Sequence, residues 1–109
     1  MPINYRVIVQ PAALHDMEDI VGYVAGELKN PSAAQKLAQD LTKGIASLGH
    51  LPTRCPAHAP IRPLKHEYRK LRVGNYLAFF WVSEEDETVT VVRVLYARRD
   101  FDRRLEQPS

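Results

Sequence analysis

The sequence predicts an α+β fold in which a hairpin of two helices packs on a mostly antiparallel, four-stranded sheet. Two stripes of apolar residues with helical spacing occupy residues 11–48, and segments rich in β-branched and aromatic residues occupy 71–96. The link between the helices is short, which favours antiparallel neighbours. The element order is β-α-α-β-β-β, and a short terminal helix can follow. Because 109 residues suffice for one core, we expect a single domain over residues 1–109.

The first half of the chain carries the signals of one strand and two helices. Apolar and polar residues alternate over residues 3–9, which is typical of a short strand. Pro11 suits the first turn of a helix, where its missing N–H is harmless. Asn30 is a good N-cap for a second helix that begins at Pro31 and stops near Gly49. The apolar stripes are Leu14, Met17, Val21, Val24 and Leu28 in the first helix, and Leu37, Leu41, Ile45 and Leu48 in the second.

A proline-rich stretch separates the helices from the remaining strands. Four prolines lie within residues 50–63, a density that blocks both helix and central strand, so we expect an irregular surface loop. Leu71 and Val73 belong to the second strand, which carries Arg72 outward. The Gly74-Asn75 dipeptide then predicts a turn.

The last third of the chain predicts a hairpin with an unusually apolar strand. Residues 76–82 are apolar on both faces, so we expect a central strand that is covered on both sides. The stretch 83–87, with four acids, forms the hairpin tip, residues 88–96 form the last strand, and 98–105 form a short helix or helical turn. A chain of this length has little left to cover the second face of the sheet. We therefore hypothesise that part of this face is meant for another protein.

Charge is distributed unevenly along a chain whose formal net charge is +2. Residues 1–49 hold four basic and five acidic side chains, whereas residues 50–109 hold eleven basic and eight acidic ones. Four of those eight acids are consecutive at 84–87, so the rest of the second half is strongly basic. A basic surface favours a polyanion or an acidic protein as partner, but a solvated basic face without a ligand has the same composition.

Several classes of protein and site are disfavoured by what the sequence lacks. The longest apolar run, 76–82, is far too short to span a membrane, and the N-terminal residues show no secretory leader pattern. Cys55 is the single cysteine, so no internal disulfide can form and we expect a cytoplasmic protein. Histidine spacing fits no structural zinc site, and no glycine-rich phosphate loop is present, so we expect neither metal nor cofactor. A nucleophilic pair of Cys55 and His58 has no further support.

Arginine and lysine form two clusters in the second half. If the strands that carry them flank the central strand, both clusters converge on one side of the sheet. Guanidinium groups there would bind phosphate oxygens and stabilise the charge of phosphodiester cleavage, while Tyr68, Tyr76 and Tyr96 would stack on unpaired bases. The alternative is that the final arginines form a solvated helix face paired with nearby acids. The first cluster is Arg62, Lys65, Arg69, Lys70 and Arg72, and the second is Arg93, Arg98, Arg99, Arg103 and Arg104.

Arg93 lies in an otherwise apolar strand, between Val91-Val92 and Val94-Leu95. A buried arginine without a partner is costly. Its guanidinium must therefore reach solvent past the sheet, meet a carboxylate, or serve a binding site.

The residues from 70 to 82 (KLRVGNYLAFFWV) and from 88 to 100 (TVTVVRVLYARRD) resemble the RelE/ParE toxin superfamily. The N-terminal half is similar to the same family, with its strand, the segment from Pro11 to Val24, and the segment from Pro31 to Ala34. The resemblance spans nearly the whole chain. It implies the toxin of a bacterial type II toxin–antitoxin pair, bound in a hetero-oligomer by a cognate antitoxin. An antitoxin segment that is apolar and acidic would suit this basic chain.

The resemblance leaves two targets open, the ribosome with its mRNA and DNA gyrase. RelE-like members cleave mRNA in the ribosome with basic residues, to which Arg72, Arg98 and Arg99 correspond, with Tyr96 or a histidine as a substitute acid or base. Leu77 and Leu105 stand where the nuclease pattern has an arginine and a tyrosine. The candidates for RNA or target binding are Arg62, Lys65, Arg69, Lys70, Arg93, Arg103 and Arg104.

Those two departures favour ParE-like inhibition of gyrase, which involves no chemistry. A ribosome-dependent, metal-independent mRNA endoribonuclease is the alternative. A family member that keeps antitoxin binding but has lost toxicity is a third hypothesis.

Overall fold

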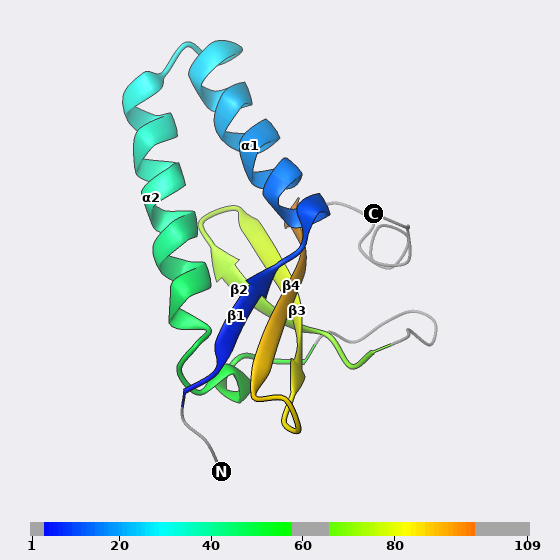
Figure 1. Ribbon diagram of the computed structural model, residues 1–109. Helices are drawn as coiled ribbons and strands as arrows, with labels where there is room; N and C mark the ends of the chain where they lie inside the picture. The colour runs from blue at the N-terminus through cyan, green and yellow to red at the C-terminus, as the bar shows by residue number, and fades with distance from the viewer. Residues whose placement is uncertain (1–3, 58–65, 98–109) are drawn as a thin grey trace.

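The computed structural model describes residues 4–57 and 66–97 (Figure 1). Its elements are β1 (Arg6–Val9), α1 (Pro11–Gly26), α2 (Pro31–Ser47), a 3-10 turn η1 (Pro52–Arg54), β2 (Arg69–Val73), β3 (Tyr76–Ser83) and β4 (Thr88–Tyr96). The predicted order of strands and helices is confirmed. The terminal helix expected at 98–105 lies outside the described residues.

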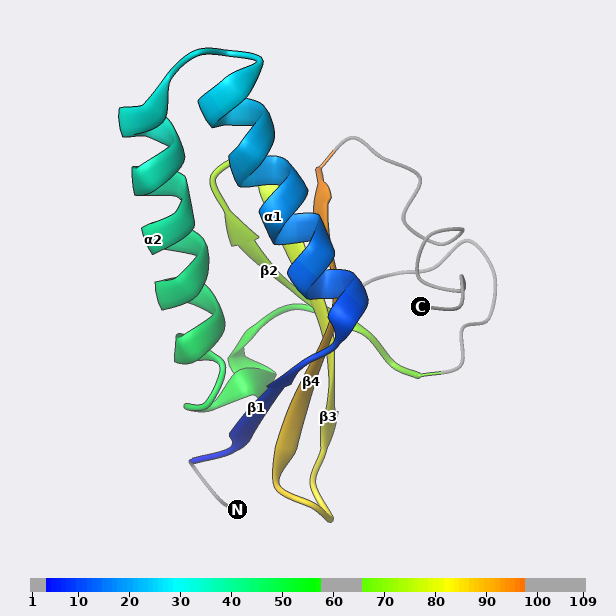
Figure 2. The same cartoon turned by 45° about the horizontal axis from the view of Figure 1, so that its top comes forward.

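The four strands form one mixed sheet in the order β1-β4-β3-β2. The pairs β2/β3 and β3/β4 are antiparallel, whereas β1 runs parallel to β4. The helical hairpin carries the chain from β1 at one edge of the sheet to β2 at the other, and it lies along one face of the sheet (Figures 1 and 2). We call the face toward the helices the inner face and the opposite one the outer face.

The helical hairpin has the ends that the sequence predicts. Asn30 caps α2, because its side-chain oxygen accepts a hydrogen bond from the N–H of Ala33 at 3.2 Å. Helix α1 packs against α2 and β4, and α2 packs against β2. The approach of α2 to β2 is close at Gly44, where a Cβ atom would lie 2.9 Å from the Cγ2 atom of Val73. No described helix is both long and apolar enough for a membrane crossing.

The main core lies between the helices and the inner face of the sheet. Leu41 and Ile45 from α2 meet Phe80 of β3 and Val91 of β4, and all four are buried. The free thiol of Cys55, which is 5% exposed, joins the edge of this core. Burial raises the pKa of the Cys55 thiol, although the neighbouring Arg54 and Arg69 act in the opposite direction.

A second buried cluster lies on the outer face. Leu77 and Phe79 of β3 pack with Leu95 of β4 and with Tyr68, and each is at most 8% exposed. His66 stacks on Trp81 at the border of this cluster, with ring centroids 4.1 Å apart. Burial of β3 on both faces is therefore confirmed. The side chains of this cluster are buried within the chain, so their burial alone does not require a second protein. That part of this face is meant for another protein stays a prediction.

A β-bulge in β4 decides which face Arg93 occupies. Phe79 pairs with Arg93 and Phe80 with Val91, so Val92 has no residue directly opposite it on β3. Opposed residues point to the same face, which places Arg93 on the outer face with Phe79. Regular alternation from Val91 would instead turn Arg93 inward beneath the helices.

Asp16 of α1 occupies the part of the β4 edge that β1 leaves open. Strand β1 pairs only as far as Val91, because the chain turns into α1 after Val9. Farther along β4, the N–H of Val94 donates to Oδ2 of Asp16 at 2.9 Å. The same carboxylate accepts hydrogen bonds from Nε and Nη2 of Arg93 at 2.7 and 2.8 Å. This single side chain thus ties α1 to the sheet.

Replacing Asp16 with alanine will destabilise the protein by about 3 kcal/mol or more. The change leaves the Arg93 side chain, which is only 17% exposed, without its carboxylate partner, and it leaves the N–H of Val94 without its acceptor. Urea unfolding followed by Trp81 fluorescence measures the loss. Glu18→Ala on the same helix is the control, because Glu18 is exposed and should change stability by less than about 0.5 kcal/mol. Equal losses in the two variants would contradict the structural role of Asp16.

Cys55 will react with a disulfide reagent at pH 8 much more slowly in the folded protein than after unfolding in urea. Burial restricts access to the thiol, and its raised pKa lowers the reactive thiolate fraction. A cysteine introduced at exposed Asp86 in a Cys55→Ala background gives the reference rate. Equally fast reaction at both positions in the folded state would show that this part of the core is open.

Candidate functional site

The residues proposed from the sequence fall into two sets. Those that lie outside the described residues are Arg62, Lys65, Arg98, Arg99, Arg103 and Arg104. Those that the structure describes are Arg69, Lys70, Arg72, Arg93 and Tyr96. The described five do not form one site, because they differ in the face they occupy and in the partners they already have.

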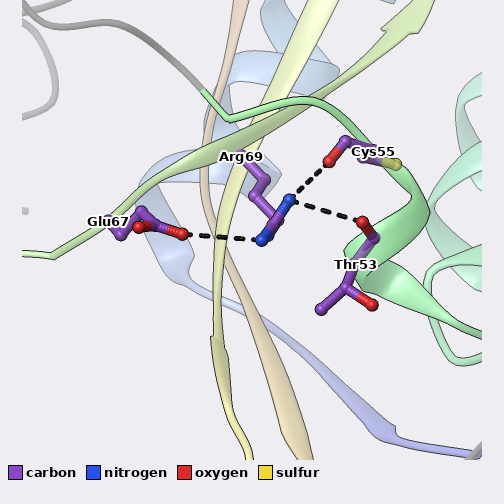
Figure 3. A network of polar contacts seen from close by, with 4 residues as sticks. All are labelled: Thr53, Cys55, Glu67 and Arg69. Carbon is purple, nitrogen blue, oxygen red and sulfur yellow. Dashed lines mark hydrogen bonds and ion pairs between the residues drawn. The ribbon is translucent and has the colours of Figure 1, made fainter.

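Arg69 joins β2 to the proline-rich loop. Figure 3 shows its guanidinium between backbone carbonyls on one side and a carboxylate on the other: Nη1 donates to the carbonyl oxygens of Cys55 and Thr53 at 2.7 and 3.4 Å. Nη2 lies 3.5 Å from Oε1 of Glu67. The arginine that the sequence assigned to target binding therefore holds the segment around Cys55 against β2.

Arg93 meets a carboxylate, which is one of the three outcomes its sequence position allowed. Its side chain is 17% exposed and that of Asp16 is 13% exposed. The hydrogen bond to Asp16 raises the pKa of Arg93, although burial alone would lower it. A guanidinium held in this way serves the fold, so the structure favours that role over the predicted contact with a target.

Lys70 and Arg72 share the outer face of β2, since they oppose Phe79 and Leu77. They line a shallow hollow together with Arg54, a residue that the sequence analysis did not select. Arg72 is exposed, and its Nε donates to the carbonyl oxygen of Gly74 at 2.9 Å. We call Arg54, Lys70 and Arg72 the basic hollow.

Arg54 was not selected from the sequence, because it lies in the proline-rich loop apart from the two basic clusters. In the fold it follows the C-terminal end of α2, where its guanidinium donates to the carbonyl oxygens of His50 at 2.5 Å and Leu51 at 3.1 Å. Leu51, the residue before η1, has a left-handed backbone, with φ of 47°. The only signal in the sequence was a cation near the helix end, which is a common capping residue.

Tyr96 lies on the other face of the sheet. It opposes Tyr76, which packs on the inner core, and the two rings meet edge to face with centroids 5.8 Å apart. Both rings line a hollow beside α1 that also contains Tyr23 and Asp19. Desolvation raises the pKa of Tyr76, and the nearby Tyr96 and Tyr23 hydroxyls raise it further.

Arg72 and Tyr96 were predicted to work together if the protein is a nuclease, but the fold does not bring them together. Arg72 projects from the outer face, and Tyr96 lies on the inner face within a hollow that holds acids. A carboxylate-lined site repels the phosphate backbone that Tyr96 would have to approach. Leu77, which stands where the nuclease pattern has an arginine, lies directly opposite Arg72.

Within residues 4–57 and 66–97, no group of three or more metal-binding side chains comes together. The thiol of Cys55 is buried and its pKa is raised, so it lacks the properties of a nucleophile. Among the described residues, the basic hollow and the aromatic hollow beside α1 lie on opposite faces of the sheet.

Known proteins resemble this chain over nearly its whole length. The family model described as the ParE toxin of the parDE type II toxin–antitoxin system matches residues 7–101. Toxin ParE1 of Mycobacterium tuberculosis is 34% identical over 103 residues, which cover 94% of this chain and all of that protein.

Solved structures of other proteins share the fold. The chromosomal ParDE system from P. aeruginosa has a chain with a TM-score of 0.66 and 18% identity, covering 86% of this chain and 97% of that one. The toxin–antitoxin complex RelBE2 from Mycobacterium tuberculosis gives a TM-score of 0.59 and 19% identity, covering 88% and 94% of the two chains. Since the family model and ParE1 both match nearly the full length, this chain belongs to the ParE toxin family of type II toxin–antitoxin systems.

Proposed function

We propose that this toxin arrests growth by inhibiting DNA gyrase in the cytoplasm, and that it acts by binding without chemistry. The observation that carries the proposal is the separation of Arg72 and Tyr96 on opposite faces of the sheet. Arg69 and Arg93, two further cations that RNA binding would use, are engaged by the loop carbonyls and by Asp16. What the outer face offers instead is an exposed basic hollow, which suits an acidic protein surface.

A cognate antitoxin completes the proposal. The solved relatives with this fold include a chromosomal ParDE system and a RelBE toxin–antitoxin complex. We expect an antitoxin segment with acidic and apolar side chains to reach the basic hollow and so compete with the target. In the cell the free toxin is then the active form, and the hetero-oligomer with the antitoxin is the inactive form.

The alternative function is ribosome-dependent cleavage of mRNA, and the basic hollow favours it. Arg54, Lys70 and Arg72 converge on one surface, and arginine side chains bind phosphate oxygens with two parallel hydrogen bonds. This alternative requires Arg98 and Arg99 as the remaining catalytic cations.

Induction of the toxin in cells without antitoxin will stop growth with filamentation and intact mRNA. Purified toxin at micromolar excess will inhibit supercoiling by gyrase, because a protein that blocks the enzyme by binding acts stoichiometrically. Primer extension on total mRNA is the matched measurement in the same cells. New 5′ ends at in-frame codon positions, lost in Arg98→Ala/Arg99→Ala, would establish the nuclease instead. Normal growth despite folded toxin would identify a member that has lost toxicity.

Arg72→Glu will reduce inhibition of gyrase by about tenfold or more, because it places a carboxylate in the basic hollow among cations that face the target. Lys43→Glu is the matched control, since it makes the same charge change at an exposed position of α2 away from β2's outer face. Supercoiling assays across a titration of each variant give the concentration for half inhibition. Equal potency of the Arg72 variant and the wild type would show that the basic hollow does not contact gyrase.

A further inference from the structure

The hollow beside α1 is a second candidate binding surface, separate from the basic hollow. It has a volume of about 670 Å³ and lies between α1 and the ends of β3 and β4. Tyr23 from α1 lines it together with Tyr76 of β3 and Tyr96 of β4, and Leu28, which follows α1, also contributes to its lining. The opening exists because β1 is shorter than β4, so helix α1 alone borders the last residues of β4 on that side.

Several large apolar side chains that line this hollow are exposed to solvent, although apolar side chains are more stable when buried. Tyr23 is 54% exposed, Leu28 is 57% exposed, and Tyr96 is 40% exposed. Large apolar side chains that gather on one exposed surface mark a binding site more often than isolated ones do. Tyr76 and Tyr96 meet edge to face, with ring centroids 5.8 Å apart, and both line the hollow.

The charge of the hollow identifies the ligand that it would attract. Helix α1 contains three acids and no lysine or arginine. Asp16 is engaged by Arg93, whereas Asp19 is exposed at the rim of the hollow and takes part in no ion pair among the described residues. Tyrosine faces attract a cation, and a carboxylate beside them strengthens the attraction. If the cation belongs to a lysine or arginine, Leu28 would pack on the aliphatic part of that lysine or arginine side chain.

We propose that this hollow binds an arginine or lysine side chain, which the antitoxin presents on an apolar segment. The inference rests on the proposed function, because the occupant is the antitoxin. The basic hollow and this tyrosine hollow lie on opposite faces of the sheet, so one rigid target surface cannot fill both. A chain that wraps around the toxin can place acidic residues in the first and a cation in the second.

Calorimetric titration of the antitoxin into full-length toxin variants tests the proposal. Asp19→Asn and Tyr23→Ala will each weaken the complex by about tenfold, which corresponds to about 1.4 kcal/mol. Both side chains are exposed, so the variants should fold, and thermal unfolding verifies this. Glu18→Gln and Leu14→Ala on the same helix are the matched controls and will bind like the wild type. Unchanged affinity of the Asp19 and Tyr23 variants would overturn the proposal.

A small-molecule probe separates this inference from the identity of the partner. Methylguanidinium added to the full-length toxin with ¹³C-labelled tyrosine will shift the ring resonances of Tyr23, Tyr76 and Tyr96, and Asp19→Asn will abolish the shifts. Methylurea has the same shape without the charge and will leave them unchanged. Equal shifts with both compounds, or none with methylguanidinium, would overturn cation recognition even if the chain proves to be a gyrase inhibitor.

The converse outcome is also informative. If methylguanidinium shifts the tyrosine resonances but the toxin does not inhibit gyrase, the proposed function is wrong and the cation site is supported. If Asp19→Asn weakens inhibition of gyrase but not the antitoxin complex, the occupant is the target, and the assignment to the antitoxin is wrong.

Discussion

The carboxylate of Asp16 is the contact on which the arrangement of helices and sheet depends. A four-residue β1 cannot cover a nine-residue β4, so part of a central strand has an open edge. Asp16 accepts the N–H of Val94 at that edge and pairs with Arg93 at the same time. An unpaired backbone N–H at the sheet edge and a buried guanidinium without a partner would each raise the free energy of the folded state. One side chain from α1 satisfies both groups.

The same short β1 creates the surface beside α1. Where β1 ends, α1 leaves the sheet plane, and Tyr23 and Tyr96 stay accessible instead of being covered by another strand. The outer face differs in character, because the chain buries Leu77 and Phe79 there and exposes cations at the β2 edge. One sheet thus presents an aromatic, acidic surface on one side and a basic surface on the other. A partner that neutralises the toxin by wrapping can use both, whereas a flat target engages one.

Most of the described arginines in the predicted clusters stabilise the fold. Arg69 holds the loop at Cys55 against β2, and Arg93 pairs with α1. Arg54, outside those clusters, donates to the carbonyl oxygen of Ser47 at the end of α2 and also has a place in the basic hollow. A cluster of cations in a sequence therefore overstates the cations available to a ligand, because guanidinium groups are also the side chains best able to satisfy several backbone carbonyls at once.

The sequence by itself determined the order of elements, the N-cap at Asn30, the turn at Gly74 and the two-sided burial of β3, because each depends on local propensity or on the period of apolar residues. Its full-length resemblance to the RelE/ParE toxins also indicated the family. Only the tertiary structure decided the face and partner of Arg93, since a bulge at Val92 and a carboxylate 77 residues away leave no local signal. It likewise separated Arg72 from Tyr96, because strand register, which long-range packing sets, determines the faces of β2 and β4 on which they lie.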